Sequence, residues 1–272
     1  MKYCRFLLNN QTHYGTVAER NGEFWITGPA PAPEEDLAFR LALAQASSES
    51  FDFEPMPMSA ARLLLPVTPS KIICVGRNYR DHVKELGNDM PVEPLIFYKP
   101  PSSLLAPGGT VLLPALSSRV DFEGELGLVI GKRVHKLAPD ADLRGVIRGY
   151  TLADDISARD LQKKDGQWTR AKGFDTFCPV GPLVSDEIDP IGGVTLETRI
   201  NGELRQTGST LDFIFSIPAV LSFITAAITL EPGDLILTGT PSGVGPLAPG
   251  DQVEVHIAGL GTLSHAVAAD AF

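Results

Sequence analysis

The sequence is poor in cysteine, in positive charge and in long apolar runs, and each shortage excludes a class of protein. Its 272 residues include three cysteines, Cys4, Cys74 and Cys178, which are too few and too scattered for a disulfide framework and indicate a reducing compartment. Lysines and arginines number 23 against 33 aspartates and glutamates, so the net charge is −10. Such an acidic chain lacks the basic surface that binds nucleic acid or an anionic membrane.

No secretory or membrane-spanning segment is expected. The apolar start of the chain ends at Asn9, which is too early for a signal peptide. The uncharged stretch Phe213–Leu230 is interrupted by Pro218 and diluted by serine and threonine, so it predicts a buried helix rather than a membrane span. With a hydrophobic content of 43%, the sequence predicts a folded, cytoplasmic protein.

The first quarter of the chain predicts a small β-rich subdomain and linker over residues 1–67. Short strands are expected at 2–8 and 14–27, and Asn21-Gly22 inside the second is a hairpin signal. A helical patch is expected around residues 37–44.

The remainder, residues 68–272, is expected to form the catalytic domain. Strands dominate it without regular alternation with helices, which indicates an α+β fold rather than a doubly wound sheet. The predicted strands are 71–75, 95–98, 126–130, 195–200, 235–238 and 252–257, and the predicted helices are 79–87, 156–164 and 217–229.

Acidic side chains at alternate positions precede an apolar strand. If the strand already runs there, Asp121, Glu123 and Glu125 share one face. Buried together they would repel each other unless a cation lay among them. The alternative is a solvated strand face. Phe122 and Gly124, which would then face the core, do not resemble core positions, which favours the acidic side as the functional interior.

A second acidic pair, Asp154-Asp155, follows an apolar run and precedes a predicted helix. One of the two is expected to cap this helix and the other to point elsewhere. Together with Glu123 and Glu125, the pair would supply a third carboxylate ligand. Because no histidine or cysteine lies nearby in sequence, the implied metal is Mg²⁺ or Mn²⁺ rather than Zn²⁺.

At these residues the sequence resembles the fumarylacetoacetate hydrolase superfamily, from Lys71 to the C-terminus. The branch with acylpyruvate hydrolases and oxaloacetate decarboxylases is the most similar. The resemblance implies a mixed β-sandwich roll with few helices, usually dimeric. It rests on the ordered motifs Cys74–Tyr79 with Asp81-His82, Phe97–Pro100, Glu123–Leu126, Asp155–Asp160, Lys172–Pro179 and Gly239–Gly245.

The resemblance implies that Glu123, Glu125 and Asp155 bind Mg²⁺ or Mn²⁺, because the family aspartate directly precedes an Ile-Ser-Ala-Arg run. Asp121 then becomes a neighbour rather than a ligand. The fumarylacetoacetate-cleaving members have a fourth acidic ligand at a position that aligns here with Val75. Its replacement by valine argues against fumarylacetoacetate as the substrate.

His82 and Glu85 lie three residues apart in a predicted helix, so their side chains can meet. A carboxylate beside an imidazole raises its basicity and fixes its tautomer, as a general base needs. The alternative is an ordinary surface pair, whereas the resemblance assigns His82 and Glu85 to a lid over the substrate. For Lys172 the default interpretation is a surface lysine, whereas the resemblance assigns it to substrate oxygens and developing negative charge.

Arg159 and Gln162 follow Asp155 by four and seven residues, which on a helix would place all three on one face. Arg159 could simply pair with a nearby aspartate, whereas the resemblance assigns it and Gln162 to the substrate. Thr240, in the glycine-rich turn 239–245, is expected to bind the substrate carboxylate through its hydroxyl and backbone N–H.

The other histidines and Cys178 show no partner pattern. Cys178 is interpreted as a packing residue, because no base is identifiable for it. The histidines interpreted as structural or surface residues are His13, His135, His256 and His265.

These observations predict a metal-dependent hydrolase that cleaves a C–C bond in a small 2,4-dioxo acid of the acylpyruvate type through an enolate. His82, oriented by Glu85, would activate the attacking water. Oxaloacetate decarboxylation or keto–enol tautomerisation at the same site is the alternative. A non-catalytic metal- or ligand-binding homologue is an alternative of another class. The expected partners are a 2-oxo acid and a second copy of the chain in a homodimer, with no nucleic acid and no membrane.

Overall fold

The computed structural model describes residues 1–36 and 53–271, so the helical patch predicted around 37–44 lies outside the described residues. The helices are α2 (Arg80–Glu85), α3 (Arg159–Asp165), α4 (Thr169–Lys172) and α5 (Ile217–Ala227), with 3₁₀ turns η1 (Met58–Ala60), η2 (Pro101–Ser103) and η3 (Thr210–Asp212). The strands are β1 (Lys2–Leu8), β2 (Gln11–Arg20), β3 (Glu23–Pro29), β4 (Met56–Pro57), β5 (Arg62–Leu64), β6 (Ile72–Gly76), β7 (Leu95–Lys99), β8 (Leu104–Leu105), β9 (Thr110–Leu113), β10 (Val120–Phe122), β11 (Gly124–Ile130), β12 (Ile147–Asp154), β13 (Ser157–Ala158), β14 (Cys178–Ser185), β15 (Thr195–Ile200), β16 (Glu203–Ser209), β17 (Leu235–Leu237), β18 (Gly245–Pro246), β19 (Gln252–Ile257) and β20 (Gly261–Ala269).

Strands predominate over helices and form three sheets, two of which contain both parallel and antiparallel pairs, as an α+β fold predicts. The largest runs in the order β4-β3-β2-β1-β14-β12-β11-β17-β6-β7, with β5 added beside β1 and β8 beside β14. A second sheet has the order β16-β15-β19-β20-β9, and a short third sheet has the order β13-β10-β18. Most neighbours are antiparallel, whereas β6 pairs with β17, β8 with β14 and β9 with β20 in parallel.

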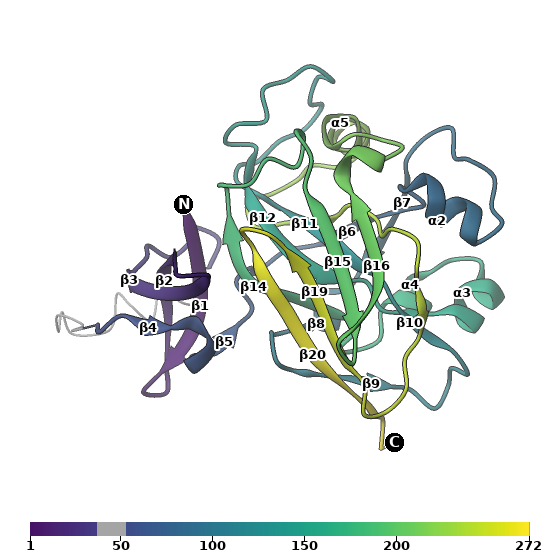
Figure 1. The fold of residues 1–272 in the computed structure, drawn as a ribbon. Coiled ribbons are helices and arrows are strands. Elements are labelled where there is room, and N and C mark those ends of the chain that lie inside the picture. Colours follow the sequence, from purple (N-terminus) through teal and green to yellow (C-terminus); the bar gives the residue numbers. More distant parts are fainter. Residues whose placement is uncertain (37–52, 272) are drawn as a thin grey trace.

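Strands β1 to β5 form a lobe at one side of the molecule, drawn in purple to blue in Figure 1. The predicted strand over 14–27 is the β2–β3 hairpin, and Asn21 and Gly22 turn it with φ values of 52° and 80°. The lobe is continuous with the rest, because Lys2 pairs with Ser185 and Tyr3 with Val184. The domain boundary at residues 67 and 68 remains a prediction.

The central strand β11 is buried along its whole length between the sheets. Leu126, Leu128 and Ile130 belong to one core cluster and Val129 to another, as alternating side chains of a doubly covered strand should. One expectation here is wrong. Phe122 is fully buried among apolar side chains, so the side opposite the acidic residues is a core side after all.

The apolar stretch at 213–230 contains a short helix of 11 residues, α5. Its buried residues Ile217, Val220, Leu221 and Ile224 follow helical spacing and pack into the main core. Among the described residues, no helix has the length and apolar character that crossing a membrane requires.

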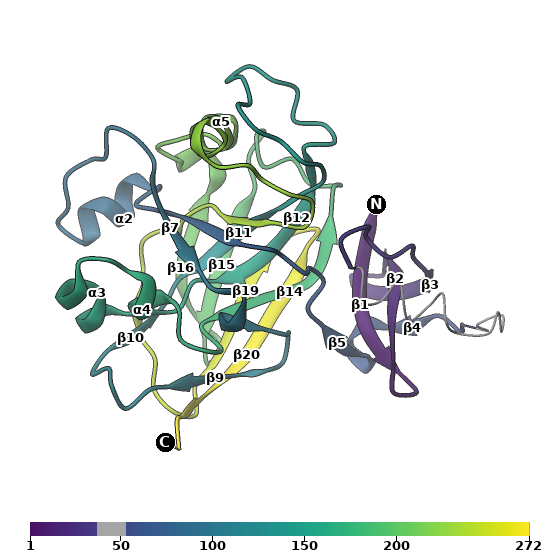
Figure 2. The same ribbon diagram turned by 180° about the vertical axis from the view of Figure 1, so that it is seen from behind.

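Helices α2, α3 and α4 gather at the side of the molecule away from the lobe, as both Figure 1 and Figure 2 show. Helix α2 follows β6 in the chain, and α3 follows β12 and the short strand β13. The site residues predicted from the sequence come from these helices, from the start of β11, from the end of β12 and, for Thr240, from the turn after β17.

Candidate active site

Three buried carboxylates meet where β10 gives way to β11 and where β12 ends. Glu123 is the single residue between β10 and β11, and Glu125 is the second residue of β11. Because β11 and β12 are antiparallel neighbours, the end of β12 places Asp155 beside the two glutamates. The Asp155 N–H donates to the Glu123 carbonyl at 2.8 Å. One oxygen of each carboxylate lies within 4.8 Å of the others, and the three residues are at most 4% exposed.

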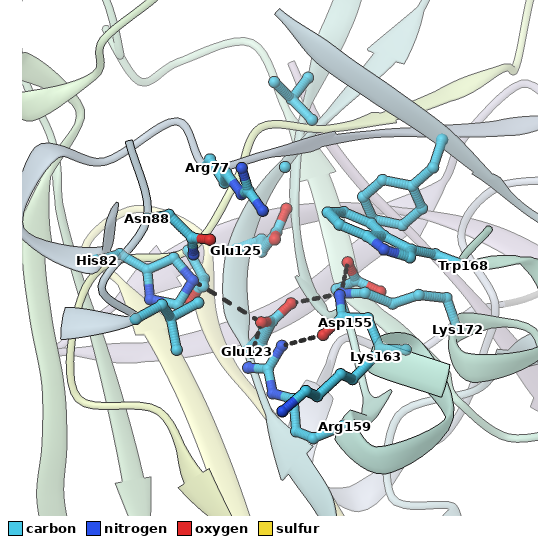
Figure 3. A pocket seen from close by; sticks show the side chains of 16 residues that line it. Arg77, His82, Asn88, Glu123, Glu125, Asp155, Arg159, Lys163, Trp168 and Lys172 are labelled. Carbon is cyan, nitrogen blue, oxygen red and sulfur yellow. Dashed lines mark hydrogen bonds and ion pairs between the residues drawn. The ribbon is translucent and has the colours of Figure 1, made fainter. Parts of the chain in front are cut away.

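Cationic side chains neutralise two of these carboxylates. Lys172 Nζ lies 2.5 Å from Glu123 Oε2 and 2.6 Å from Asp155 Oδ2. Lys99 Nζ lies 2.7 Å from the other oxygen of Asp155. Arg159 Nη2 lies 2.5 Å from Glu123 Oε1, as Figure 3 shows for the labelled pair. Lys172 is therefore no surface lysine, because its side chain is 2% exposed.

Glu125 has no such cation. In the described part of the chain, the one hydrogen bond to its carboxylate comes from the Gly239 N–H, at 2.7 Å. Burial, followed by the charges of Asp155 and Glu123, raises the pKa of Glu125 well above its usual range. For Glu123, burial also raises the pKa, but Arg159 and Lys172 outweigh it and hold the pKa below its ordinary value. Glu123 and Asp155 are therefore neutralised by cationic side chains, whereas Glu125 is not.

The residues present fit a hard divalent cation. Oxygen ligands at carboxylates are what Mg²⁺ and Mn²⁺ prefer, and each carboxylate oxygen can accept more than one partner. A dication among Glu123, Glu125 and Asp155 would remove the repulsion that disfavours an ionised Glu125. The pocket above them has a volume of about 290 Å³, which leaves room for further ligands.

His82 and Glu85 meet as the sequence predicts. Their side chains extend from α2, where His82 Nδ1 lies 3.2 Å from Glu85 Oε2 and His82 is 4% exposed. The other ring nitrogen, Nε2, points toward the carboxylate cluster and lies 4.0 Å from Glu123 Oε1 (Figure 3). Glu85 also accepts a hydrogen bond from the Gly243 N–H at 3.0 Å, which ties α2 to the glycine-rich turn. This geometry suits a histidine whose tautomer is fixed by Glu85 and whose free nitrogen faces the pocket.

Arg159 and Gln162 both line the pocket, but the helix that carries them begins later than predicted. Residues 157 and 158 form β13, which pairs with β10, so α3 starts at Arg159 and Asp155 does not share its face. Neither Asp154 nor Asp155 caps this helix by a side-chain hydrogen bond, which corrects that expectation. Arg159 donates to Gln162 at 3.1 Å and to Asp121 at 2.9 Å, so Asp121 is a neighbour of the cluster.

Thr240 lies in the pocket lining, but its hydroxyl is already engaged. It donates to the Gly124 carbonyl at 2.9 Å and accepts from Gln206 Nε2 at 2.8 Å. The Thr240 N–H, in contrast, has no acceptor within residues 1–36 and 53–271. The backbone N–H rather than the hydroxyl is therefore the group of Thr240 that is left for a ligand.

Sequence reasoning missed several residues of this region. Gln206 is fully buried, and besides Thr240 it contacts the Gly124 N–H at 3.1 Å and the Pro241 carbonyl at 2.8 Å. His265, interpreted as a structural or surface residue without a recognisable partner pattern, is buried and pairs with Asp154. No local pattern signals such a contact, because it joins β20 to the end of β12.

Cys178 behaves as predicted from its lack of a base. It is fully buried, and burial raises the pKa of its thiol to about 12 despite the nearby charge of Lys99. Such a thiol is a packing residue rather than a nucleophile.

Comparison with known proteins matches most of the chain to one family. The family model of the fumarylacetoacetate (FAA) hydrolase C-terminal domain matches residues 71–268. The mitochondrial oxaloacetate decarboxylase of Dictyostelium discoideum is 46% identical over 204 residues, which cover 72% of this chain and 92% of that protein. The mitochondrial oxaloacetate tautomerase of Mus musculus is 45% identical over 194 residues, which cover 70% and 87%. The crystal structure of 2-hydroxyhepta-2,4-diene-1,7-dioate isomerase from Mycobacterium marinum aligns with a TM-score of 0.84 at 37% identity and covers all of both chains.

Proposed function

Because the chain belongs to the fumarylacetoacetate hydrolase family, we propose that it is a divalent-metal-dependent enzyme that forms an enolate from a small 2-oxo acid, with oxaloacetate as the substrate. The observation that carries this proposal is the buried triad of Glu123, Glu125 and Asp155 beneath the free ring nitrogen of His82. Relatives named for reactions of oxaloacetate, at 45% and 46% identity, support the choice of substrate.

The triad would hold Mg²⁺ or Mn²⁺, which when bound supplies a Lewis acid for the 2-keto oxygen. The unpaired Thr240 N–H would bind the neighbouring carboxylate of the substrate. Lys172 extends its buried ammonium into the pocket, where it would stabilise the negative charge that develops on oxygen.

Keto–enol tautomerisation is the reaction that requires the fewest catalytic groups, because only a proton moves. His82 Nε2 would accept a proton from C3, while Glu85 holds the Nδ1 hydrogen and so keeps Nε2 free to act as the base. Return of a proton to the 2-oxygen gives the enol. Decarboxylation would instead start from the bound keto form: the C3–C4 bond breaks, CO₂ leaves, and the electron pair of that bond passes to the 2-oxygen to give the enolate of pyruvate, which then takes up a proton at C3. No water needs to be activated in either case.

Hydrolysis of an acylpyruvate is the second candidate, and the pairing of His82 with Glu85 favours it. A histidine oriented by a carboxylate is what deprotonation of an attacking water requires. That water would add to the distal carbonyl, and the C–C bond would break to leave the enolate of pyruvate. The two candidates share the triad and differ in whether His82 takes its proton from carbon or from water.

A substrate panel with metal-depleted protein tests the proposal. Oxaloacetate tautomerisation, oxaloacetate decarboxylation and acetylpyruvate cleavage would each be followed with Mg²⁺, with Mn²⁺ and with EDTA. We expect oxaloacetate turnover that needs metal and is lost in Glu123→Gln. His82→Asn should keep metal binding while turnover falls by about 10²–10⁴-fold.

The exposed His256 provides a matched control, because His256→Asn should change neither property. Cleavage of acetylpyruvate without oxaloacetate turnover would reverse the order of the two candidates. A wild-type protein that binds metal but turns over no member of the panel would favour the non-catalytic homologue.

A further inference from the structure

Four lysine or arginine side chains line the pocket, and they fall into two pairs. Arg159 and Lys172 already form ion pairs with carboxylates of the cluster. Arg77 and Lys163 also line the pocket, and neither has an acidic partner within 4.0 Å among the described residues. In a protein of net charge −10, these two unpaired cations add positive charge at the pocket that can attract an anionic ligand.

Arg77 is the more constrained of the two. It follows β6 in the left-handed backbone region, at φ 58°, which is uncommon for a residue that is not glycine. The next residue, Asn78, is buried and anchored by side-chain hydrogen bonds of 2.8 Å to the Thr238 carbonyl and the Phe215 N–H. The backbone on this side of Arg77 is therefore fixed, and the strain persists because the surrounding structure imposes it.

Arg77 lies at the rim of the pocket. Its half-buried side chain lines the pocket and also an outer groove that includes Tyr98, Gln167 and Thr169. In Figure 3 the guanidinium points toward the pocket, above Glu125. Lys163 is exposed on α3 and adds a second positive charge to the same lining. A strained residue thus holds an unpaired guanidinium beside the entrance.

We infer that Arg77 binds a second carboxylate of the substrate, so that the site selects dicarboxylic 2-oxo acids over monocarboxylic ones. A guanidinium without an acidic partner is suited to a carboxylate, which it can hold by two parallel hydrogen bonds. Inside the pocket, the engaged cations and the Thr240 N–H serve the keto-acid end. Arg77 is then the group that binds the distal carboxylate. This inference rests on the proposed function and names the substrate class of the same site.

The test compares two ligands that differ at the distal end. Oxaloacetate carries the second carboxylate, and 2-oxobutanoate has a methyl group in its place. For Arg77→Gln, which removes the charge and leaves the other pocket residues in place, we expect the KM for oxaloacetate to rise about 10–100-fold. The inhibition constant of 2-oxobutanoate should stay within about twofold of wild type. Arg77→Lys should recover part of the loss.

Lys164→Gln is the matched control, since Lys164 is exposed on α3 next to Lys163 but does not line the pocket. Thermal melting of each variant reports whether it folds. Equal losses with both ligands, or no change with either, would overturn the role of Arg77. Wild-type protein that does not convert oxaloacetate overturns the proposed function instead. Titration calorimetry of both ligands with Mg²⁺ present then tests Arg77 without turnover, by the same difference in affinity.

Discussion

His265 Nε2 lies 2.8 Å from Asp154 Oδ2, and neither side chain is exposed to solvent. The other oxygen of Asp154 accepts the N–H of Glu123 at 2.7 Å. The pair thus joins β20, near the end of the chain, to the backbone of one predicted metal ligand and to the residue before another, Asp155. Groups that hold ligands in this way commonly change metal affinity when they are removed.

Removing the imidazole should therefore weaken metal binding. We expect His265→Ala to raise the Kd for Mg²⁺ or Mn²⁺ by about 10–100-fold. It should lower the free energy of unfolding by about 1–3 kcal/mol, because Asp154 loses a buried partner. Titration calorimetry and denaturant unfolding of the metal-free protein measure the two effects. His256→Ala, on the exposed strand face, is the control. An unchanged Kd in a folded His265→Ala protein would contradict the positioning role.

Lys172 should stabilise the metal-free protein more than the metal-bound one. Burial lowers its pKa, but the carboxylates of Asp155 and Glu123 outweigh this and hold the pKa above its usual value. Lys172→Met leaves those carboxylates facing each other with less positive charge, and breaking a buried ion pair typically costs about 3–5 kcal/mol.

We expect that loss in denaturant unfolding without metal, and a larger stabilisation by Mg²⁺ in the variant than in wild type. Lys164→Met, on the surface of α3, should be neutral. A variant as stable as wild type in EDTA would argue against this account of the cluster.

Gly124 should tolerate no side chain, because a Cβ there would overlap Thr198 Oγ1. Thr198 is fully buried, and its hydroxyl has no hydrogen-bond partner within the described ranges. Gly124→Ala should lower the free energy of unfolding by about 1–3 kcal/mol, as overpacking does. Adding Thr198→Ala removes the overlapping oxygen and should restore most of the loss. Denaturant unfolding of wild type, the two single variants and the double variant measures the coupling between the two positions in a double-mutant cycle. Additive effects would show that the overlap is relieved elsewhere.

Asp160 predicts a pH-dependent contribution to stability. Hydrogen bonds from the Ser117 side chain and the Ser118 backbone lower the pKa of its carboxyl to about 2. Because the folded pKa lies below the unfolded one of about 3.9, the contribution is present above pH 4 and is lost as the pH falls toward 2.

The carboxylate is partly solvated, so the contribution at pH 7 should be at most about 1 kcal/mol. The difference in unfolding free energy between wild type and Asp160→Asn should shrink steadily between about pH 4 and pH 2. A difference that stays constant over this range would exclude the mechanism.

The parts of the site that could be predicted from the sequence are those whose residues lie close together in the chain and form short recognisable patterns. Glu123, Glu125 and the segment at Asp155 stand out because closely spaced acidic residues border apolar strands, and the structure brings them together. His82 and Glu85 are recognisable because three residues of helix bring their side chains into contact. Their roles in binding and catalysis remain predictions, as does the homodimer.

The wrong predictions concern residues whose structure is decided by contacts with segments distant in sequence, which local patterns do not contain. The helix predicted from 156 starts at Arg159, because residues 157 and 158 are taken up by pairing with β10. The side of Phe122 was not expected to be core, because Phe122 and Gly124 at alternate positions give no sign of the apolar cluster that covers Phe122. The partners of Gln206 lie at least 34 residues away in sequence, and His265 pairs with Asp154, which is 111 residues away, so nothing near either residue signals these contacts.

The pairing of β1 with β14 has a consequence for any shortened form of the protein. Of residues 1–36 and 53–70, none lines the pocket at the carboxylate cluster, so the lobe contributes no described residue to that lining. Without it, however, the end of β14 near Val184 and Ser185 would present unpaired backbone groups to solvent. Such an exposed strand edge can pair with strands of other chains. A truncated protein that starts near residue 68 should therefore retain the pocket residues but self-associate, with aggregation rather than lost chemistry as its first defect.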